Sequence, residues 1–228
     1  ATAFALAQEG ASVILVARRA DRLKSLADRI AEIGAKSLTI VGDVAEASTA
    51  LEVIKETKKV FGRVDILVNN AGVMLLGPID RANTEDWEKM IKLNVLGLMY
   101  FTKAAVAVMK EQKSGHIVNL SSVAGRLARA GSSGYNASKW AVGAFSEALR
   151  QEVCSDNIRV TLVEPGMVLT ELTDHITHED VKEQVKNRAK AMTALNSEDI
   201  ADTIVFAVTR PSHVNINEIL VRPTEQQI

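Results

Sequence analysis

The feature of this sequence that most constrains its fold is the alternation of short apolar runs with longer segments of helical spacing. The expected strands cover residues 12–16, 38–41, 64–68, 115–122, 158–163 and 218–221. The expected helices cover residues 1–8, 21–33, 46–61, 83–110, 135–153, 179–191 and 197–208. Strands that are apolar throughout and joined by helices favour a parallel sheet covered on both faces. We therefore predict an α/β fold with a doubly wound parallel sheet in three layers.

Length and composition indicate one domain, residues 1–228. The chain is 47% hydrophobic and 24% charged with a net charge of −1, which is typical of a globular protein with a single core. No Lys- or Arg-rich block suggests nucleic-acid binding. The single cysteine, Cys154, excludes an intrachain disulfide and fits a reducing compartment. No apolar run approaches a membrane span and no signal peptide is recognisable, so we expect a cytoplasmic protein without membrane contact.

Polar residues and glycines follow the expected strands directly. These positions are Arg18, Asp43, Asn70, Ser122 and Gly166. In a doubly wound sheet, ligands bind at the carboxyl ends of the strands near the point where the strand order reverses. The sequence therefore predicts one binding site at this edge of the sheet.

Three side chains near this edge could share one chemical task. Tyr135 and Lys139 stand four residues apart, so on a helix they lie on one face, and Ser122 ends an apolar run upstream. For a tyrosine to accept a proton near neutrality, its pKa must fall from ~10, which takes roughly 4 kcal/mol, and a nearby ammonium acts in that direction. Ser122 could donate to a carbonyl oxygen that gains charge. The alternative is a capped helix with a surface lysine and a buried tyrosine.

Five ordered motifs carry a resemblance to a known family. They are Asn69-Asn-Ala-Gly72, Asn94-Val-Leu-Gly97, Ser122, Tyr135-x-x-x-Lys139, and Pro165-Gly166 followed by Thr170. In order and spacing the chain resembles the short-chain dehydrogenases/reductases over essentially its whole length, and most of all their NADP-dependent branch acting on short hydroxy acids, aldehydes and related alcohols. The resemblance implies a Rossmann-like fold, hydride transfer between NADP(H) and a small alcohol or carbonyl compound, and a homo-oligomer, either a dimer or a tetramer.

The resemblance also implies a role for each matching position. Tyr135 is the general acid/base, Lys139 binds ribose and tunes the phenol, and Ser122 orients the carbonyl. Asn94 kinks its helix and holds a water of a proton relay, unless it is an ordinary polar residue of an amphipathic helix. The other implied cofactor contacts are Asp43 and Val44 around the adenine, Asn70, Ala71 and Gly72 in a close turn, Pro165, Gly166 and Val168 beside the nicotinamide, and Thr170 near the pyrophosphate. The alternative for Thr170 is a helix N-cap.

The end of the expected strand over residues 12–16, which resembles the second strand of the family pattern, indicates the choice of cofactor. NAD enzymes usually place an acid there to bind the ribose hydroxyls, and this acid would repel a 2′-phosphate. Here the sequence reads Val16-Ala17-Arg18-Arg19, and guanidinium groups suit a phosphate. We therefore predict NADP, with Arg18 as the stronger ligand and Arg19 as either a second ligand or a solvated charge.

The sequence departs from the family pattern at its start. The glycine-rich turn that presents helix-terminal N–H groups to the pyrophosphate is absent, and Ala1 aligns inside the helix that follows this turn. Without the central first strand, the strands ending at Val16 and Val68 would each have one unpaired edge, and the core would be open. We expect roughly 10–20 residues ahead of Ala1, the length of a strand with a tight loop.

The substrate side is less constrained by the sequence. Residues 74–76 could form an apolar wall or simply pack in the core, and Arg126 and Arg129 could meet a substrate carboxylate or remain solvated loop charges. Residues 170–195 are a plausible lid. Its Asp174–His178 cluster has no recognised ligand spacing, so we expect no metal site. Besides an oxidoreductase, a non-catalytic NADP-binding or interaction protein of the same fold remains an alternative.

Overall fold

The computed structural model describes residues 1–227, and it confirms the predicted alternation of strands and helices. The strands are β1 (Val13–Ala17), β2 (Ser37–Val41), β3 (Ile66–Asn69), β4 (Gly115–Leu120), β5 (Ile158–Pro165) and β6 (Glu218–Val221). The α-helices are α1 (Thr2–Gln8), α2 (Ala20–Glu32), α3 (Ala47–Phe61), α4 (Thr84–Met90), α5 (Leu98–Gln112), α6 (Ser133–Val153), α7 (Glu179–Lys190) and α8 (Ser197–Val208). Four short elements were not predicted: η1 (Ile91–Gly97), η2 (Val123–Gly125), η3 (Cys154–Asp156) and η4 (Glu171–His175).

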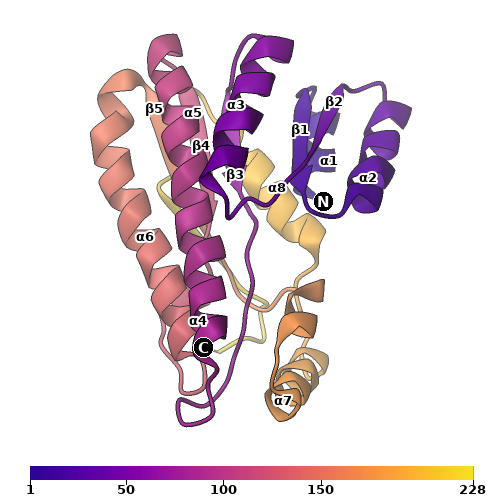
Figure 1. Ribbon diagram of the computed structural model, residues 1–228, viewed down its shortest axis with the longest axis vertical. Helices are drawn as coiled ribbons and strands as arrows, with labels where there is room; N and C mark the ends of the chain where they lie inside the picture. Colours follow the sequence, from indigo (N-terminus) through magenta and orange to yellow (C-terminus); the bar gives the residue numbers. More distant parts are fainter. Residues whose placement is uncertain (228) are drawn as a thin grey trace.

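All strand pairs are parallel, as predicted, and they form two sheets. One sheet has the order β3-β4-β5-β6, and the other consists of β1 and β2 alone. In Figure 1, β1 and β2 stand on the right with α1 and α2, apart from β3, β4 and β5. Within the described part of the chain β1 and β3 are not paired with each other, in agreement with the open edges that the sequence predicts for them. The expectation of residues ahead of Ala1 stays a prediction.

Strand β4 lies at the centre of the three layers. All six of its residues are buried. Ile117 packs among α3, α5 and α6, which run side by side across the front of Figure 1, whereas the next residue, Val118, packs on the other face with Ile200 and Ile204 of α8. Neighbouring residues of a strand point to opposite faces, and burying such an aliphatic side chain contributes about 1.5–3 kcal/mol. The burial of the whole strand is thus explained by helices on both sides.

The long helix expected over residues 83–110 is present but interrupted. Asn83 caps α4 by accepting from the Glu85 backbone N at 3.0 Å, and the π-helical segment η1 separates α4 from α5. The prediction that no apolar run approaches a membrane span is wrong by length and composition, because the helical stretch Thr84–Gln112, with η1 included, has 29 residues and contains a window apolar enough to cross a membrane. Half of its most apolar window is buried inside the protein, as in the core helix of a globular domain.

Gly97 at the end of η1 allows a close approach between helix and loop. A Cβ atom at this position would lie 2.8 Å from the carbonyl oxygen of Val44, which follows β2. Only glycine permits this contact without a backbone shift. The glycine therefore holds the η1 helix against the loop that carries Asp43 and Val44.

Candidate active site

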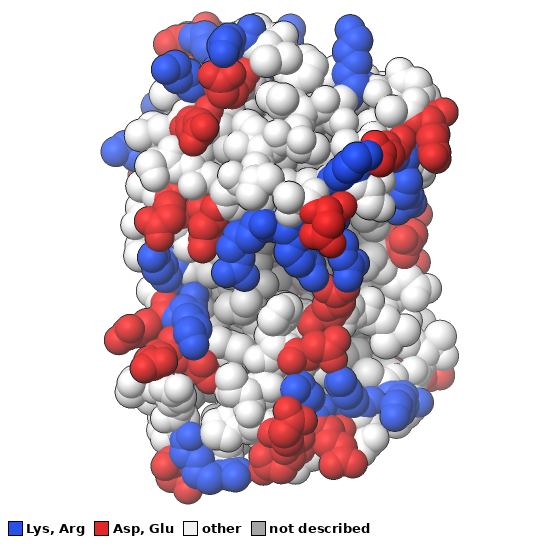
Figure 2. Space-filling model, turned by 45° about the vertical axis from the view of Figure 1, so that its right-hand side comes forward, with Lys and Arg blue, Asp and Glu red and all other residues white. Residues whose placement is uncertain are grey.

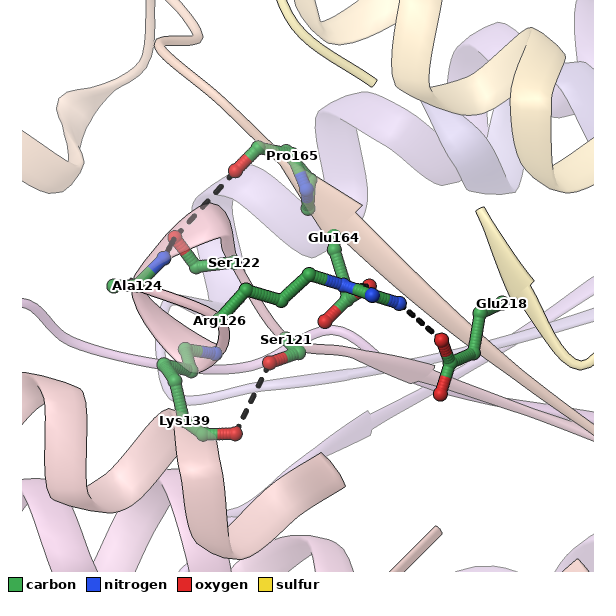
Figure 3. Close-up of polar contacts among 8 residues, drawn as sticks. All are labelled: Ser121, Ser122, Ala124, Arg126, Lys139, Glu164, Pro165 and Glu218. Atoms are coloured by element: carbon green, nitrogen blue, oxygen red, sulfur yellow. Dashed lines mark hydrogen bonds and ion pairs between the residues drawn. The ribbon is translucent and has the colours of Figure 1, made fainter. Parts of the chain in front are cut away.

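Two of the predicted positions, Ser122 and Gly166, lie just after the carboxyl ends of β4 and β5. β4 ends at Leu120, and Ser122 follows in extended conformation as the cap of η2. Its Oγ accepts from the Ala124 backbone N at 3.1 Å and donates to the Pro165 carbonyl oxygen at 3.4 Å (Figure 3). This pair of contacts places the hydroxyl between the loop after β4 and the end of β5.

Helix α6 carries Tyr135 and Lys139 into the same region. Both residues are only 7% exposed, and the Lys139 Nζ lies 5.8 Å from the centre of the Tyr135 ring. Lys139 Nζ donates to the Leu120 carbonyl oxygen at 2.8 Å, and Ser121 Oγ donates to the Lys139 carbonyl oxygen at 3.1 Å. The first turns of α6 are thus fixed to the end of β4, and the predicted trio is assembled.

Desolvation disfavours the charged forms of these two buried side chains. Burial lowers the pKa of Lys139 from 10.5 to about 8. Burial also raises the pKa of Tyr135 from 10.0 to about 12, and the hydrogen bond with Ser122 works against this rise. The predicted lowering of the Tyr135 pKa is therefore wrong for this structure, because desolvation of the phenolate outweighs the favourable contacts. At neutral pH the phenol is a proton donor.

Asn94 lies within the π-helical segment and is 2% exposed. Its Oδ1 accepts from the Val73 backbone N at 2.8 Å, and its Nδ2 donates to the Val73 carbonyl oxygen at 2.9 Å and to Ser138 Oγ at 3.1 Å. The wide turn of a π-helix is a frequent functional distortion. Asn94 therefore connects the segment after Gly72 with α6, which is more than an ordinary polar position on a helix would do.

Asn136 is a positioning residue that the sequence did not reveal. It is 5% exposed, and its Nδ2 donates to the carbonyl oxygens of Ala124 at 2.7 Å and Leu127 at 2.8 Å. Its Oδ1 accepts from the Arg129 backbone N at 3.3 Å. The loop between Ser122 and Tyr135 is thus organised by the residue next to Tyr135. The only sequence feature that could have indicated this role is that an amide residue stands inside the Tyr-x-x-x-Lys motif.

Arg126 joins this loop to two strands. In Figure 3 its side chain extends from the loop toward Glu164, near the end of β5, and Glu218, at the start of β6, and it forms an ion pair with each carboxylate. The Glu164 side chain is 3% exposed, and burial raises the pKa of this carboxyl while Arg126 opposes the rise. Arg126 is therefore neither a solvated charge nor an open carboxylate ligand. A charged residue in the apolar run before Pro165 was the signal for this cluster.

An apolar cluster surrounds the phenol. Tyr135 packs with Leu76, Met90 and Ile176, and with the partly buried Met74 and Leu75. The α7 residues Val181 and Val185 belong to the same cluster, so α7 covers this side of the site. Residues 74–76 therefore form an apolar wall and pack in the core at the same time.

The predicted phosphate ligands lie close to acidic side chains. Figure 2 shows one face of the molecule, on which basic side chains gather near the middle with acidic side chains beside them. The exposed Arg18 has its Nη1 3.9 Å from Asp43 Oδ2. Arg19 and Arg22 both contact Glu171, at 2.9 and 3.2 Å, and sequence reasoning missed Arg22 and this pairing.

The other predicted cofactor contacts have more local partners. Asp43 Oδ1 accepts from the Ala45 backbone N at 2.9 Å, and Val44 packs against the core. Thr170 caps η4 by accepting from the Leu172 backbone N at 3.2 Å, which is the alternative considered for it. Gly166 donates its backbone N–H to the Val221 carbonyl oxygen at 2.7 Å. Val168 pairs with Leu195 in an isolated bridge, and Asn70 and Ala71 are exposed beside the half-buried Gly72.

The residues near Gly72 fit a nicotinamide cofactor. An ammonium has three N–H donors, and within residues 1–227 Lys139 has the Leu120 oxygen as its one hydrogen-bond acceptor, so two donors are available for ribose hydroxyls. A Cβ on Gly72 would lie 3.1 Å from Asn94 Oδ1 and 3.9 Å from Lys139 Nζ, so glycine leaves the Lys139 side open. Among the described residues, no group of three or more His, Cys, Asp or Glu could hold a metal ion.

Comparisons with known proteins agree with this fold. Residues 1–181 match the family described as short chain dehydrogenase. An uncharacterized oxidoreductase of Staphylococcus saprophyticus subsp. saprophyticus is 38% identical over 98% of this chain and 90% of its own. The closed form of a serine dehydrogenase complexed with NADP+ superposes with a TM-score of 0.87 at 35% identity, covering 97% of this chain and 89% of that chain. Serine dehydrogenase from Escherichia coli superposes with a TM-score of 0.84 at 33% identity, covering 100% and 93%.

Proposed function

This chain belongs to the short-chain dehydrogenase family of nicotinamide-dependent oxidoreductases, and from this premise we propose that it transfers a hydride between NADP(H) and a small alcohol or carbonyl compound. Hydroxy acids, aldehydes and ketones are the substrates we consider. One observation carries the proposal: Ser122, Tyr135 and Lys139 meet at the ends of β4 and β5, supported by Asn94. A protein that only bound NADP or a partner would not need this buried set of polar groups, which opposes the non-catalytic alternative.

Each of the catalytic side chains has its own role in carbonyl reduction. A nicotinamide cofactor, when bound, supplies the hydride to the carbonyl carbon. Tyr135, which is protonated at neutral pH, donates its proton to the carbonyl oxygen. Ser122 donates a hydrogen bond to the same oxygen and stabilises its developing charge. In the reverse direction Tyr135 accepts the alcohol proton, and the buried ammonium of Lys139 stabilises the phenolate.

NADP rather than NAD is the proposed cofactor. Arg18 follows β1 with an exposed side chain and only a 3.9 Å contact to Asp43, so it is free to turn to a 2′-phosphate. Arg19 must leave Glu171 to act as a second ligand. The serine dehydrogenase complexed with NADP+ supports this choice by similarity. Asp43, Val44, Asn70, Pro165, Val168 and Thr170 remain proposed contacts along the cofactor.

A homo-oligomer and a cytoplasmic location belong to the same proposal. Trp140 on α6 is 52% exposed, and Ile91 and Leu96 on the adjacent η1 are 40% and 36% exposed, which is an apolar surface suited to a second copy. Residues 170–195 are the proposed lid of the single catalytic domain. Their α7 helix already packs on the Tyr135 cluster, so its opening would admit substrate.

A substrate panel tests the oxidoreductase function directly. Short aldehydes, 3-hydroxy acids, serine-like amino alcohols and dicarbonyls are followed at the nicotinamide absorbance, with NADP(H) and NAD(H) in parallel. We expect turnover with at least one class and a preference for NADP(H). Tight NADPH binding without turnover of any class would instead support the non-catalytic alternative.

A further inference from the structure

Two arginine side chains near the catalytic loop have buried nitrogens without a hydrogen-bond partner. Arg129 Nη2 and Arg222 Nε are both inaccessible to solvent and meet no acceptor within residues 1–227. Burial lowers the pKa of Arg129, and the positive charges of Arg188 and Arg222 lower it further. A buried N–H of a charged guanidinium without an acceptor is unfavourable, so these two half-buried arginines indicate an anionic ligand.

The two arginines come from segments that border the catalytic groups. The backbone of Arg129 is fixed by Asn136, the residue after Tyr135. Arg222 directly follows Val221, whose carbonyl oxygen accepts from Gly166 N at 2.7 Å, so it lies beside the segment after β5. Both arginines therefore adjoin the edge of the sheet where Ser122 and Tyr135 lie.

Helix α7 contributes a third positive charge, that of Arg188, which acts on Arg129. Arg188 stands three residues after Val185, and both positions lie on one face of the helix. Val185 packs in the apolar cluster with Tyr135, so this face is turned toward the site. Arg188 has an interaction of its own, so it adds to the positive field and is not counted as an open donor.

Arg126, on the same loop, has acidic partners for its guanidinium group. It is paired with Glu164 and Glu218, as Figure 3 shows, whereas Arg129, three residues later, has no acidic partner among the described residues. The loop thus carries one arginine that holds the fold and one that is open to a ligand. The sequence alone did not separate these two roles.

We propose that Arg129 and Arg222, in the positive field of Arg188, form a subsite for a carboxylate carried by the substrate. This inference rests on the proposed oxidoreductase function and narrows its substrates to hydroxy acids and the matching oxo acids. The planar guanidinium fork can grip a carboxylate with two parallel hydrogen bonds. The apolar wall of Met74, Leu75 and Leu76 would then contact a short carbon chain between the carboxylate and the reacting carbon.

An acid and its neutral amide test the subsite by turnover. NADP-dependent oxidation of 3-hydroxybutyrate and of 3-hydroxybutyramide, which has nearly the same shape, is measured for the wild type, Arg129→Gln, Arg222→Gln and Arg129→Lys. Arg63→Gln is the control, because Arg63 is exposed and paired with Asp65 before β3. We expect both Gln variants to lower kcat/KM for the acid by about 10- to 100-fold with little effect on the amide, and Lys to restore part of the loss. An acid-to-amide ratio that is unchanged in both Gln variants overturns the subsite.

A binding measurement separates the subsite from the oxidoreductase function. Malonate, an inert dicarboxylate, is titrated calorimetrically into each protein saturated with NADPH, and melting temperatures confirm that the variants are folded. We expect malonate affinity to fall at least about tenfold in the Gln variants but not in Arg63→Gln, with the Kd for NADPH unchanged. Arginine-dependent malonate binding without turnover of acid or amide would refute the oxidoreductase function for these substrates and keep the subsite. A malonate affinity that is unchanged in both Gln variants overturns the subsite. A loss of NADPH affinity in these variants that equals the loss of malonate affinity overturns it as well.

Discussion

Replacing Lys139 with Met should stabilise the protein at neutral pH while abolishing its function. The lowering of the Lys139 pKa from 10.5 to about 8 by burial corresponds to about 3 kcal/mol of unfavourable free energy when the side chain is charged. Methionine has a similar length and carries no charge. The substitution also removes the hydrogen bond to the Leu120 carbonyl oxygen, which lowers the stability by about 1 kcal/mol. We therefore expect a net gain of about 2 kcal/mol in the free energy of unfolding near pH 7.

The gain should depend on pH with a definite sign. Below pH 8 the lysine is charged in both the folded and the unfolded state, so the full cost is present. Between the folded value of about 8 and the unfolded value of 10.5, the unfolded state binds more protons, and the stability of the wild type therefore rises with pH. The advantage of Lys139→Met should shrink over this range and approach zero at about pH 10.

Urea unfolding of both proteins at several pH values provides the measurement. Lys103→Met is the matched control, because Lys103 is exposed on α5, and its effect should stay within about 0.5 kcal/mol at every pH. A Lys139→Met protein that is less stable than the wild type at neutral pH, or a difference that does not change with pH, would refute the assignment of a destabilising buried ammonium. Turnover of the variant should be lost, since the proposed chemistry needs the cation beside Tyr135.

Two further substitutions test the cofactor side and the helix packing. Arg18→Glu should reduce the preference of kcat/KM for NADPH over NADH by about 10- to 100-fold, since it removes a guanidinium donor and repels the 2′-phosphate; an unchanged preference would remove Arg18 from the phosphate site. Gly97→Ala should lower the free energy of unfolding by about 1–3 kcal/mol in urea, because its Cβ would meet the Val44 oxygen at 2.8 Å. Gly143→Ala on α6 is the control, since its Cβ would meet only Leu162 Cδ2 at 3.8 Å, and equal losses in the two variants would contradict the packing argument.

The strands and most helices could be predicted because burial on both faces leaves a clear pattern. β4 is buried throughout since helices cover both sides, and β6 and α8 have the predicted bounds. The π-helical segment was not predictable in this way. One wider turn around Asn94 hardly changes the spacing of apolar residues, and its cause lies in the distant backbone of Val73.

The positions of the site residues could be predicted from the sequence, but their pKa values and ion pairs could not. Ser122, Tyr135 and Lys139 meet as expected, yet the pKa of Tyr135 depends on how completely the phenol is buried, which no spacing reveals. Arg126 and Arg129 look alike in the sequence. Their difference arises because only Arg126 reaches the buried carboxylate of Glu164, which is supplied by a strand far along the chain.

The most direct test of the central claim is the pair of variants Tyr135→Phe and Tyr100→Phe, which covers both tyrosines of the chain. NADPH affinity is measured by fluorescence, and carbonyl reduction is followed at the nicotinamide absorbance. Tyr135→Phe should bind NADPH nearly as the wild type does and lose at least about 100-fold in turnover, because it lacks the donated proton. Tyr100→Phe, on α5, should keep its activity. Unchanged turnover in Tyr135→Phe would contradict the account.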